Sequence, residues 1–227
     1  MFHKFFLGFF LFLFSSANSY VYASNECPQI QTVNNLNLTE YIREQWYIQM
    51  QQITPYLPKN SNYCVFARYN KTNRHVPFFS GTVLSVYNYA NKGRVNGYNL
   101  NFNNTTLCAR VPNSNETSKL IVAPCFLPNL FGGDYWVIDV GPETNNYEYA
   151  IVIGGQPNVR LSDGCTTSNS TMNNSGLWIF SRNNTVNSSF IEERLLKLKS
   201  MNISTSLLNN VTQQNCTYRE YYKISNI

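Results

Sequence analysis

The six cysteines carry the clearest chemistry in this chain. They are an even number with no C-x-x-C pair, at Cys27, Cys64, Cys108, Cys125, Cys165 and Cys216. This spacing lacks the signature of a zinc site or of a thioredoxin-like redox centre. In an oxidising compartment such a set predicts three disulfides.

Other catalytic side chains are sparse. His75 is the only histidine after residue 3, so no Ser-His-Asp set can be assembled. Asp134 and Asp139 could protonate a bound molecule, but both lie in strand-like segments, where we favour structural hydrogen bonds. We therefore predict that the protein is not an enzyme and holds neither a metal nor a cofactor.

Asparagine is unusually frequent, at 33 of 227 residues. Twelve asparagines begin an N-x-S/T triplet, the acceptor sequence for N-glycosylation. They are Asn37, Asn70, Asn103, Asn104, Asn115, Asn169, Asn173, Asn183, Asn187, Asn202, Asn210 and Asn215. We expect several of them to carry glycans, but not both members of the adjacent pair Asn103 and Asn104.

The first residues have the pattern of a secretory leader. A lysine precedes an apolar run from Phe5 to Phe14, and small residues lead to a cleavage site after Ala23. The run is too short to span a membrane, and no second apolar stretch of spanning length follows. We predict a signal peptide over 1–23 and a secreted protein with no membrane segment after cleavage.

Composition indicates one compact unit over 24–227. The chain is 43% apolar and 15% aromatic, enough for one sizeable core. Its net charge of +5 is spread along the sequence, so we predict no nucleic-acid partner. The oligomeric state stays open between a monomer and a larger assembly.

The elements that must position any site are mostly strands. Short runs of Val, Ile, Tyr, Phe and Trp alternate with Gly, Pro, Asn and Asp, the pattern of antiparallel strands. We place strands over 45–53, 62–70, 82–90, 95–111, 118–125, 134–141, 147–154 and 177–182. Eight strands in one unit indicate a barrel or a sandwich.

One helix follows the last strong strand. Ser189 and Glu192 have the spacing of a capping box, and Ile191, Leu195 and Leu198 share one face. A single amphipathic helix after eight strands favours a barrel with a helix packed outside over an immunoglobulin-like sandwich.

The order of several motifs resembles the lipocalins, in particular the branch of apolipoprotein D and the bacterial lipocalins. Cys27-Pro28 opens the mature chain, Trp46-Tyr47 follows, and Val65–Tyr69 resembles the second strand. GDYWVIDV, YAIV and LWIFSR then resemble later strands, the last ending in the family's closing arginine, Arg182. The resemblance implies an all-β, eight-stranded antiparallel up-and-down barrel with one C-terminal helix packed outside.

Trp46 and Arg182 have a structural role in this reading. The indole can plug one end of a barrel while the guanidinium stacks on it and binds nearby carbonyls. Two departures concern this end: Glu44 stands at the place of the family's first glycine, and the T-D-Y motif is reduced to residues 144–147.

The resemblance also sets which side chains face the barrel interior. It implies a ligand-contacting set of Val65, Ala67, Tyr69, Leu84, Val86, Asn88 and Trp178. Tyr69 and Asn88 would be polar handles and Trp178 an aromatic wall. These residues could instead fill a packed interior. The set is mostly neutral, so we predict no dedicated carboxylate clamp; Arg68 and Arg110 could supply one, but alternation would place Arg68 outside.

The resemblance implies disulfides between Cys64 and Cys216 and between Cys27 and Cys165. Cys108 and Cys125 then remain to pair across a turn near Asn115. The segment 155–176 is longer than the loop expected there, and we favour a glycosylated surface loop over a lid.

We therefore expect a secreted carrier of a small hydrophobic ligand, such as a fatty acid, lysophospholipid, sterol or retinoid. Two alternatives stay open. The barrel could be a glycoprotein scaffold that binds a protein partner through its mouth loops. Less favoured is a lipid-modifying enzyme, which would require a free thiol or a mouth acid.

Overall fold

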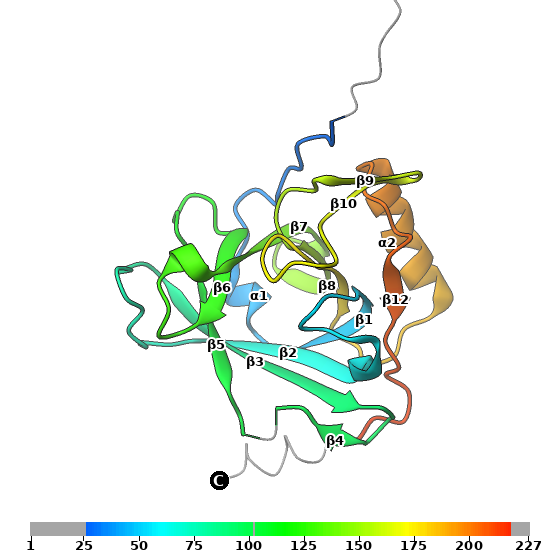
Figure 1. Ribbon diagram of the computed structural model, residues 1–227, viewed down its shortest axis with the longest axis horizontal. Helices are drawn as coiled ribbons and strands as arrows, with labels where there is room; N and C mark the ends of the chain where they lie inside the picture. Colours follow the sequence, from blue (N-terminus) through cyan, green and yellow to red (C-terminus); the bar gives the residue numbers. More distant parts are fainter. Residues whose placement is uncertain (1–25, 102, 219–227) are drawn as a thin grey trace, which may run out of the picture.

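The computed structural model describes residues 26–101 and 103–218 (Figure 1). The expected signal peptide, 1–23, lies outside these residues. The strands of the barrel wall are β1 (Trp46–Gln52), β2 (Tyr63–Lys71), β3 (Val83–Lys92), β5 (Thr106–Arg110), β6 (Lys119–Pro124), β7 (Gly133–Glu143), β8 (Asn146–Ile153) and β11 (Leu177–Ser181). The smaller elements are α1 (Leu38–Tyr41), η1 (Lys59–Ser61), β4 (Tyr98–Asn99), η2 (Asn129–Phe131), β9 (Val159–Leu161), β10 (Gly164–Thr166), α2 (Ser188–Ser200) and β12 (Leu208–Asn210).

The eight wall strands form a closed antiparallel barrel. Each pairs with the next in the order β1, β2, β3, β5, β6, β7, β8 and β11, and β11 pairs with β1 to close the wall. Helix α2 packs against the outside (Figure 1). The predicted architecture of eight strands and one external helix is confirmed.

Alternation along the strands separates an inner core from an outer one. In β8, Ala150 and Val152 point into the barrel, whereas Ile151 and Ile153 point out beneath the helix. Leu198 of α2 packs on this outer face and is fully buried. Burying a leucine in this way stabilises the fold by about 1.5–3 kcal/mol, so the helix is part of the folded core.

The expected strand over 95–111 is wrong, because the segment divides into β4 and β5. Between them the side-chain amide of Asn101 donates to the carbonyl of Thr105 and accepts from its N–H, both at 2.8 Å. Asparagine side chains can replace backbone partners in this manner and end a strand. The pattern of apolar residues gave no indication that Asn101 ends the strand.

The expected capping box of α2 is also wrong. The N-cap is Asn187, whose side chain accepts the N–H of Phe190 at 2.8 Å. Ser189 lies inside the first turn, and its hydroxyl donates to the same Asn187 oxygen at 2.9 Å. Asparagine is as good an N-cap as serine, so the helix starts two residues earlier than a cap at Ser189 implies.

Three disulfides tie the loops to the barrel. They join Cys27 to Cys165, Cys64 to Cys216, and Cys108 to Cys125, the pairs expected above. Within the described ranges, no helix is both long and apolar enough to cross a membrane.

Candidate ligand-binding site

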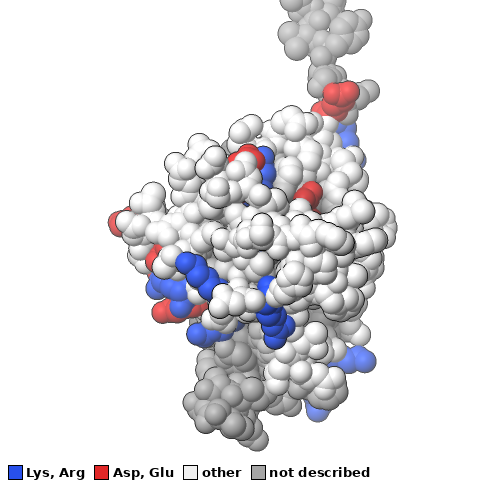
Figure 2. All heavy atoms as spheres, turned by 90° about the vertical axis from the view of Figure 1, so that its left-hand side faces the viewer, with Lys and Arg blue, Asp and Glu red and all other residues white. Residues whose placement is uncertain are grey.

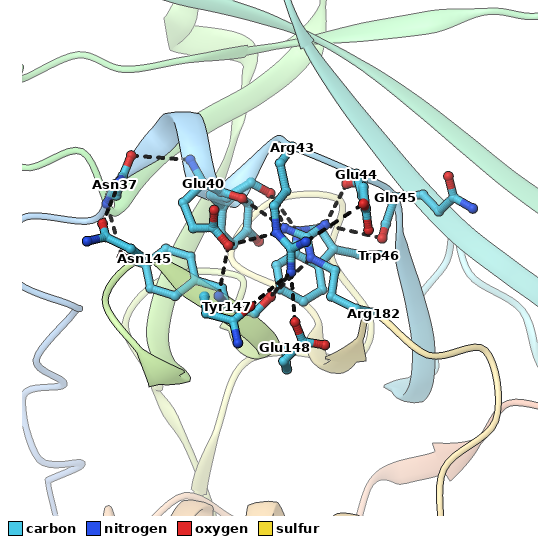
Figure 3. A network of polar contacts seen from close by, with 12 residues as sticks. Asn37, Glu40, Arg43, Glu44, Gln45, Trp46, Asn145, Tyr147, Glu148 and Arg182 are labelled. Atoms are coloured by element: carbon cyan, nitrogen blue, oxygen red, sulfur yellow. Dashed lines mark hydrogen bonds and ion pairs between the residues drawn. The ribbon is translucent and has the colours of Figure 1, made fainter.

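One end of the barrel is closed by Trp46 and Arg182 (Figure 3). Trp46 is fully buried at the start of β1, and its indole N–H donates to the Tyr41 carbonyl at 2.9 Å. The Arg182 guanidinium lies 3.4 Å from the centre of the indole ring. This is the stacked arrangement expected for the pair, and it plugs the end with an aromatic ring and a cation.

The guanidinium of Arg182 is held by main-chain oxygens. It donates to the carbonyls of Glu40, Tyr41, Glu44, Gln45 and Tyr147 (Figure 3). Burial lowers the pKa of Arg182 to about 10, and the neighbouring charge of Arg43 acts in the same direction. The group stays charged at neutral pH, and its N–H donors are hydrogen-bonded to main-chain carbonyls.

A second arginine fastens the outside of this end. Arg43 pairs with Glu40 at 2.7 Å and with Glu148 at 2.8 Å. Glu44 stands where a glycine was expected. Its main-chain carbonyl accepts a hydrogen bond from Arg182, while its side chain is 63% exposed. A residue with a side chain therefore fits here, because only the backbone is needed inside.

Most of the residues predicted to line the interior lie together there. Val65, Ala67, Tyr69, Leu84 and Val86 are all buried in the inner cluster. Trp178 packs against the same cluster and is partly exposed. The structure thus places these six side chains in one apolar environment inside the wall.

Asn88 differs from the other predicted residues because it is exposed. The pairing of β3 with β5 ends at Tyr87, and β3 then pairs with β4 from Asn91. Asn88 lies in the interval between these pairings, where its carbonyl accepts from the Asn101 side chain. Asn88 pairs with the inward Ala67 of β2, so its side chain lies on the inner face of the wall at a point that solvent reaches, and its role as a polar handle stays a prediction.

The interior contains a polar cluster that sequence reasoning found only in part. The hydroxyl of Tyr135 lies 2.6 Å from that of Tyr41 and 2.8 Å from that of Tyr69. Burial raises the pKa of all three phenols well above the usual value. Tyr69 was expected here, and Tyr135 could have been found from its alternation with Val137, but no pattern in the sequence pointed to Tyr41.

The accessible part of the interior lies at the end opposite Trp46. Trp178 pairs with Gln51, the residue five positions along β1 from Trp46. At this end the inward side chains that stay partly exposed include Ala90, Leu107, Val122, Tyr135 and Trp178. The Tyr135 and Trp178 rings stack with centroids 6.4 Å apart. These two rings mark a boundary. The interior on the side of Trp46 is packed, and we call it the lower interior; the interior on the opposite side is reached by solvent, and we call it the upper interior.

Two hollows in the described residues lie elsewhere. One, of about 240 Å³, lies near Thr32 and Glu116, and the other, of about 460 Å³, lies near Gly81 and Pro112. Neither is lined by Tyr69, Tyr135 or Trp178.

No protein-family model and no curated protein matches this sequence. Solved structures do match. Apocrustacyanin C2 is 17% identical, with 81% of this chain and 83% of that chain covered and a TM-score of 0.51. Per a 4, a major allergen from cockroaches, is 17% identical over 87% and 100%, with a TM-score of 0.50. H1 crustacyanin from the lobster Homarus americanus is 14% identical over 86% and 95%, with a TM-score of 0.50.

This chain has the lipocalin fold. Identities of 14–17% show a shared fold and no more, so the comparisons do not place the chain in a branch of lipocalins.

The C-terminal segment completes the wall of this lipocalin barrel. β1 pairs with β2 only at Trp46 and Tyr47, and β12 pairs with β1 over residues 50–52. Beyond β12, the Gln213 amide donates to the carbonyls of Ile48 and Val65, on the two separated strands. No sequence pattern identified this glutamine, because its partners are main-chain groups distant in sequence.

The long segment between β8 and β11 is anchored at several points beside the mouth. Cys165 is bonded to Cys27, and the Gln52 side chain donates to the carbonyls of Thr167 and Ser168. Tyr56 donates to the Ser175 carbonyl at 2.9 Å. These contacts join the segment to the end of β1 and to the loop after it. The segment is therefore held against the barrel along its length and not only at its two ends.

Glycosylation acceptors and cysteines complete the inventory of reactive groups. All twelve acceptor asparagines are exposed, so a glycan could be attached without opening the core. All six cysteines are in disulfides, which leaves no thiol. In the described part of the chain, no group of three His, Cys, Asp or Glu residues is arranged to hold a metal ion.

Proposed function

We propose that this protein carries a small hydrophobic molecule at the upper end of its lipocalin barrel. The observation that supports this most directly is the set of inward aromatic and aliphatic side chains that stay partly exposed there, with Tyr135 and Trp178 at their base. Apolar walls with a few polar groups are the usual lining of small-molecule sites. The opposite end is sealed by Trp46 and Arg182, so entry would be from the mouth.

Secretion belongs to the same proposal. Residues 1–23 would be removed, and residues 24–227 would act as one lipocalin domain. Three disulfides and twelve exposed glycan acceptors suit an extracellular protein. Cys27-Pro28 and the order of the later motifs support kinship with the apolipoprotein D branch. Because no cysteine is free, binding is a better proposal than thiol catalysis.

Native mass spectrometry of protein secreted from a eukaryotic host tests the carrier function. We expect a stoichiometric small molecule that organic extraction removes and that analysis of the extract identifies. Glycosidase treatment in the same experiment reports how many acceptors are filled. Failure of the chain to leave the cell, or retention of residues 1–23, would contradict the proposed secretion.

A fluorescence titration locates the site. Lipid added to the extracted protein should quench tryptophan fluorescence saturably, and Trp178→Phe should abolish most of that change. Trp136→Phe is the matched control, because Trp136 lies in the outer cluster near α2. A barrel that is recovered empty and does not respond to fatty acids, sterols or retinoids would contradict the carrier function.

A protein-binding scaffold is the second candidate, because large apolar side chains are exposed beside the mouth. Phe126, Leu130 and Phe131 in the β6–β7 loop are 75%, 85% and 59% exposed, and Met172 is 65% exposed. The backbone of Met172 lies close to Gly133, the first residue after that loop. Figure 2 shows the side of the molecule that carries β5 and β6, and uncharged residues cover most of it. Exposed apolar patches commonly mark interaction surfaces.

A further inference from the structure

The three tyrosine hydroxyls are the polar groups that meet inside the barrel. Tyr41 comes from α1 at the closed end, Tyr69 from β2 and Tyr135 from β7. Their oxygens form a chain with Tyr135 in the middle, with contacts of 2.6 and 2.8 Å. Tyr135 is the member of this chain whose ring reaches the accessible upper interior. The cluster therefore adjoins the place where a ligand would bind.

The three hydroxyl groups have one hydrogen more than the hydrogen bonds between them require. Three hydroxyls supply three hydrogens, and two oxygen–oxygen contacts consume two of them. One hydroxyl hydrogen therefore needs an acceptor from outside the cluster. Buried polar groups in folded proteins normally find a partner, so a leftover donor at the base of a binding site indicates a ligand that accepts a hydrogen bond.

Burial raises the pKa of Tyr41 and Tyr69, and the nearby charge of Arg182 opposes that shift. In residues 26–101 and 103–218, the charged side chains that are fully or nearly fully buried are Arg110 and Arg182. The guanidinium of Arg182 donates its hydrogen bonds to main-chain carbonyls at the closed end. Arg110 faces outward and donates to four carbonyls, those of Cys108, Ala123, Pro124 and Leu127, so it is no carboxylate clamp for the interior. A charged head group at the tyrosines would therefore feel the charge of Arg182 but find no charged N–H donor that is not already bonded to a carbonyl.

The phenols themselves stay neutral. Burial raises the pKa of Tyr41, Tyr69 and Tyr135 well above the usual value, so each keeps its hydrogen through the physiological range. The cluster is thus a constant donor and never a negative charge. Burying a carboxylate without a partner charge has a large free-energy cost of desolvation. Burying a neutral carbonyl has a small one, and the hydrogen bond from the cluster offsets it.

We infer that the ligand of this barrel is an uncharged lipophilic molecule with a terminal hydrogen-bond acceptor, of the ketone, aldehyde or ester class, bound with its oxygen toward the Tyr41–Tyr135–Tyr69 cluster. The inference rests on the proposed carrier function and narrows it. It disfavours fatty-acid anions and lysophospholipids among the ligands that the sequence suggested.

Three matched thirteen-carbon probes test this on the extracted full-length secreted protein: 2-tridecanone, tridecane and tridecanoate. At pH 8 the ketone should bind at least tenfold more tightly than the anion. Lowering the pH to 5 should strengthen tridecanoate binding more than tenfold, because the neutral acid is then far more abundant, while ketone binding stays unchanged.

A triple variant, Tyr41→Phe with Tyr69→Phe and Tyr135→Phe, removes the donors and keeps the rings. It should weaken ketone binding about 3- to 10-fold, the equivalent of one hydrogen bond, and leave tridecane binding unchanged. Tyr135→Phe alone should have nearly the same effect, because the hydroxyls that remain belong to Tyr41 and Tyr69, which are buried away from the accessible interior. Tyr149→Phe is the control, since Tyr149 lies outside against Phe190 of α2.

Infrared spectroscopy of ¹³C-carbonyl 2-tridecanone gives a direct readout. The carbonyl stretch of the bound ketone should lie below that of the ketone in hexane, and the triple variant should return it to the hexane value. An unshifted stretch in the wild type, equal binding of ketone and anion at pH 8, or equal weakening of ketone and alkane in the triple variant would overturn the inference and leave the carrier function standing. If none of the three probes and no cell-derived molecule binds, the carrier function itself fails.

Discussion

The guanidinium of Arg182 lies 3.4 Å from the centre of the Trp46 indole, and both groups bind the same carbonyl, that of Tyr41. The aromatic plug and the cation that covers it are thus joined through one main-chain oxygen of α1. This links the first strand, the end of the last wall strand and the short N-terminal helix at one point. The closed end is consequently held together by contacts that share one carbonyl.

Arg182→Lys should be strongly destabilising for this reason. A lysine keeps the charge but has no planar fork, so it cannot stack on the indole and reach several carbonyls at once. We expect a loss of about 3 kcal/mol in the free energy of unfolding, because buried carbonyls lose their donors. Urea unfolding followed by circular dichroism measures it. Arg68→Lys, at an outward position, is the control, and a similar loss there would contradict the argument.

The disulfides should differ in their contribution to stability. Cys64–Cys216 joins residues 152 positions apart, whereas Cys108–Cys125 joins residues 17 apart. Chain entropy predicts about 3 kcal/mol for a short loop such as the second and about 5 kcal/mol for a long loop such as the first. Paired Cys→Ser variants compared by urea unfolding should keep this order. A larger loss from removing Cys108–Cys125 would show that loop length does not control the effect.

The main features of the fold could be predicted because they depend on patterns that short segments carry. Alternating apolar residues indicated the eight wall strands, and Ile191, Leu195 and Leu198 indicated the external helix. The errors concern side chains that bond to the backbone. Asn101 ends a strand at 95–111, and Asn187 caps α2 in place of Ser189. Such bonds depend on one residue rather than on a periodic pattern.

The candidate site was less predictable than the fold. The resemblance set the phase of alternation that placed Val65, Leu84 and Trp178 in the interior, but it could not show that Asn88 lies where β3 changes partners. Tyr41 reaches the interior from a short helix, outside any strand register. Its contact with Tyr135 joins residues 94 positions apart, and only the assembled barrel brings them together.

Gln213→Leu should loosen the wall between β1 and β2. The variant removes the donors to the carbonyls of Ile48 and Val65 and the acceptor of the Tyr218 hydroxyl. We expect a loss of about 2 kcal/mol, because buried polar groups would lose their partners. Hydrogen exchange of β1 and β2 amides should become faster. Gln214→Leu is the neighbouring control at an exposed position, and equal effects of the two variants would contradict a specific role for Gln213.

Asp139 and Asp163 should respond to pH in opposite directions. Burial raises the pKa of Asp139 beside α2, although the Lys197 ammonium at 3.7 Å opposes the shift. The folded protein therefore holds this proton more tightly than the unfolded chain does. The stability that comes from protonated Asp139 is complete below the unfolded pKa of about 3.9 and is lost as the pH rises through the folded pKa.

Asp139→Asn imitates the protonated form and should keep that stability at all pH values. Its Tm should equal that of the wild type near pH 4 and exceed it at pH 7.5, by at most about 4 °C for a chain of this size. Asp163 has its pKa lowered by the Ser204 hydroxyl, so its contribution is present above the unfolded pKa and is lost as the pH falls through the folded pKa. Asp163→Asn should therefore lower Tm at pH 7.5, with a smaller effect in acid. Differential scanning calorimetry at the two pH values checks both, and a Tm change of the same sign for the two variants at pH 7.5 would contradict these assignments.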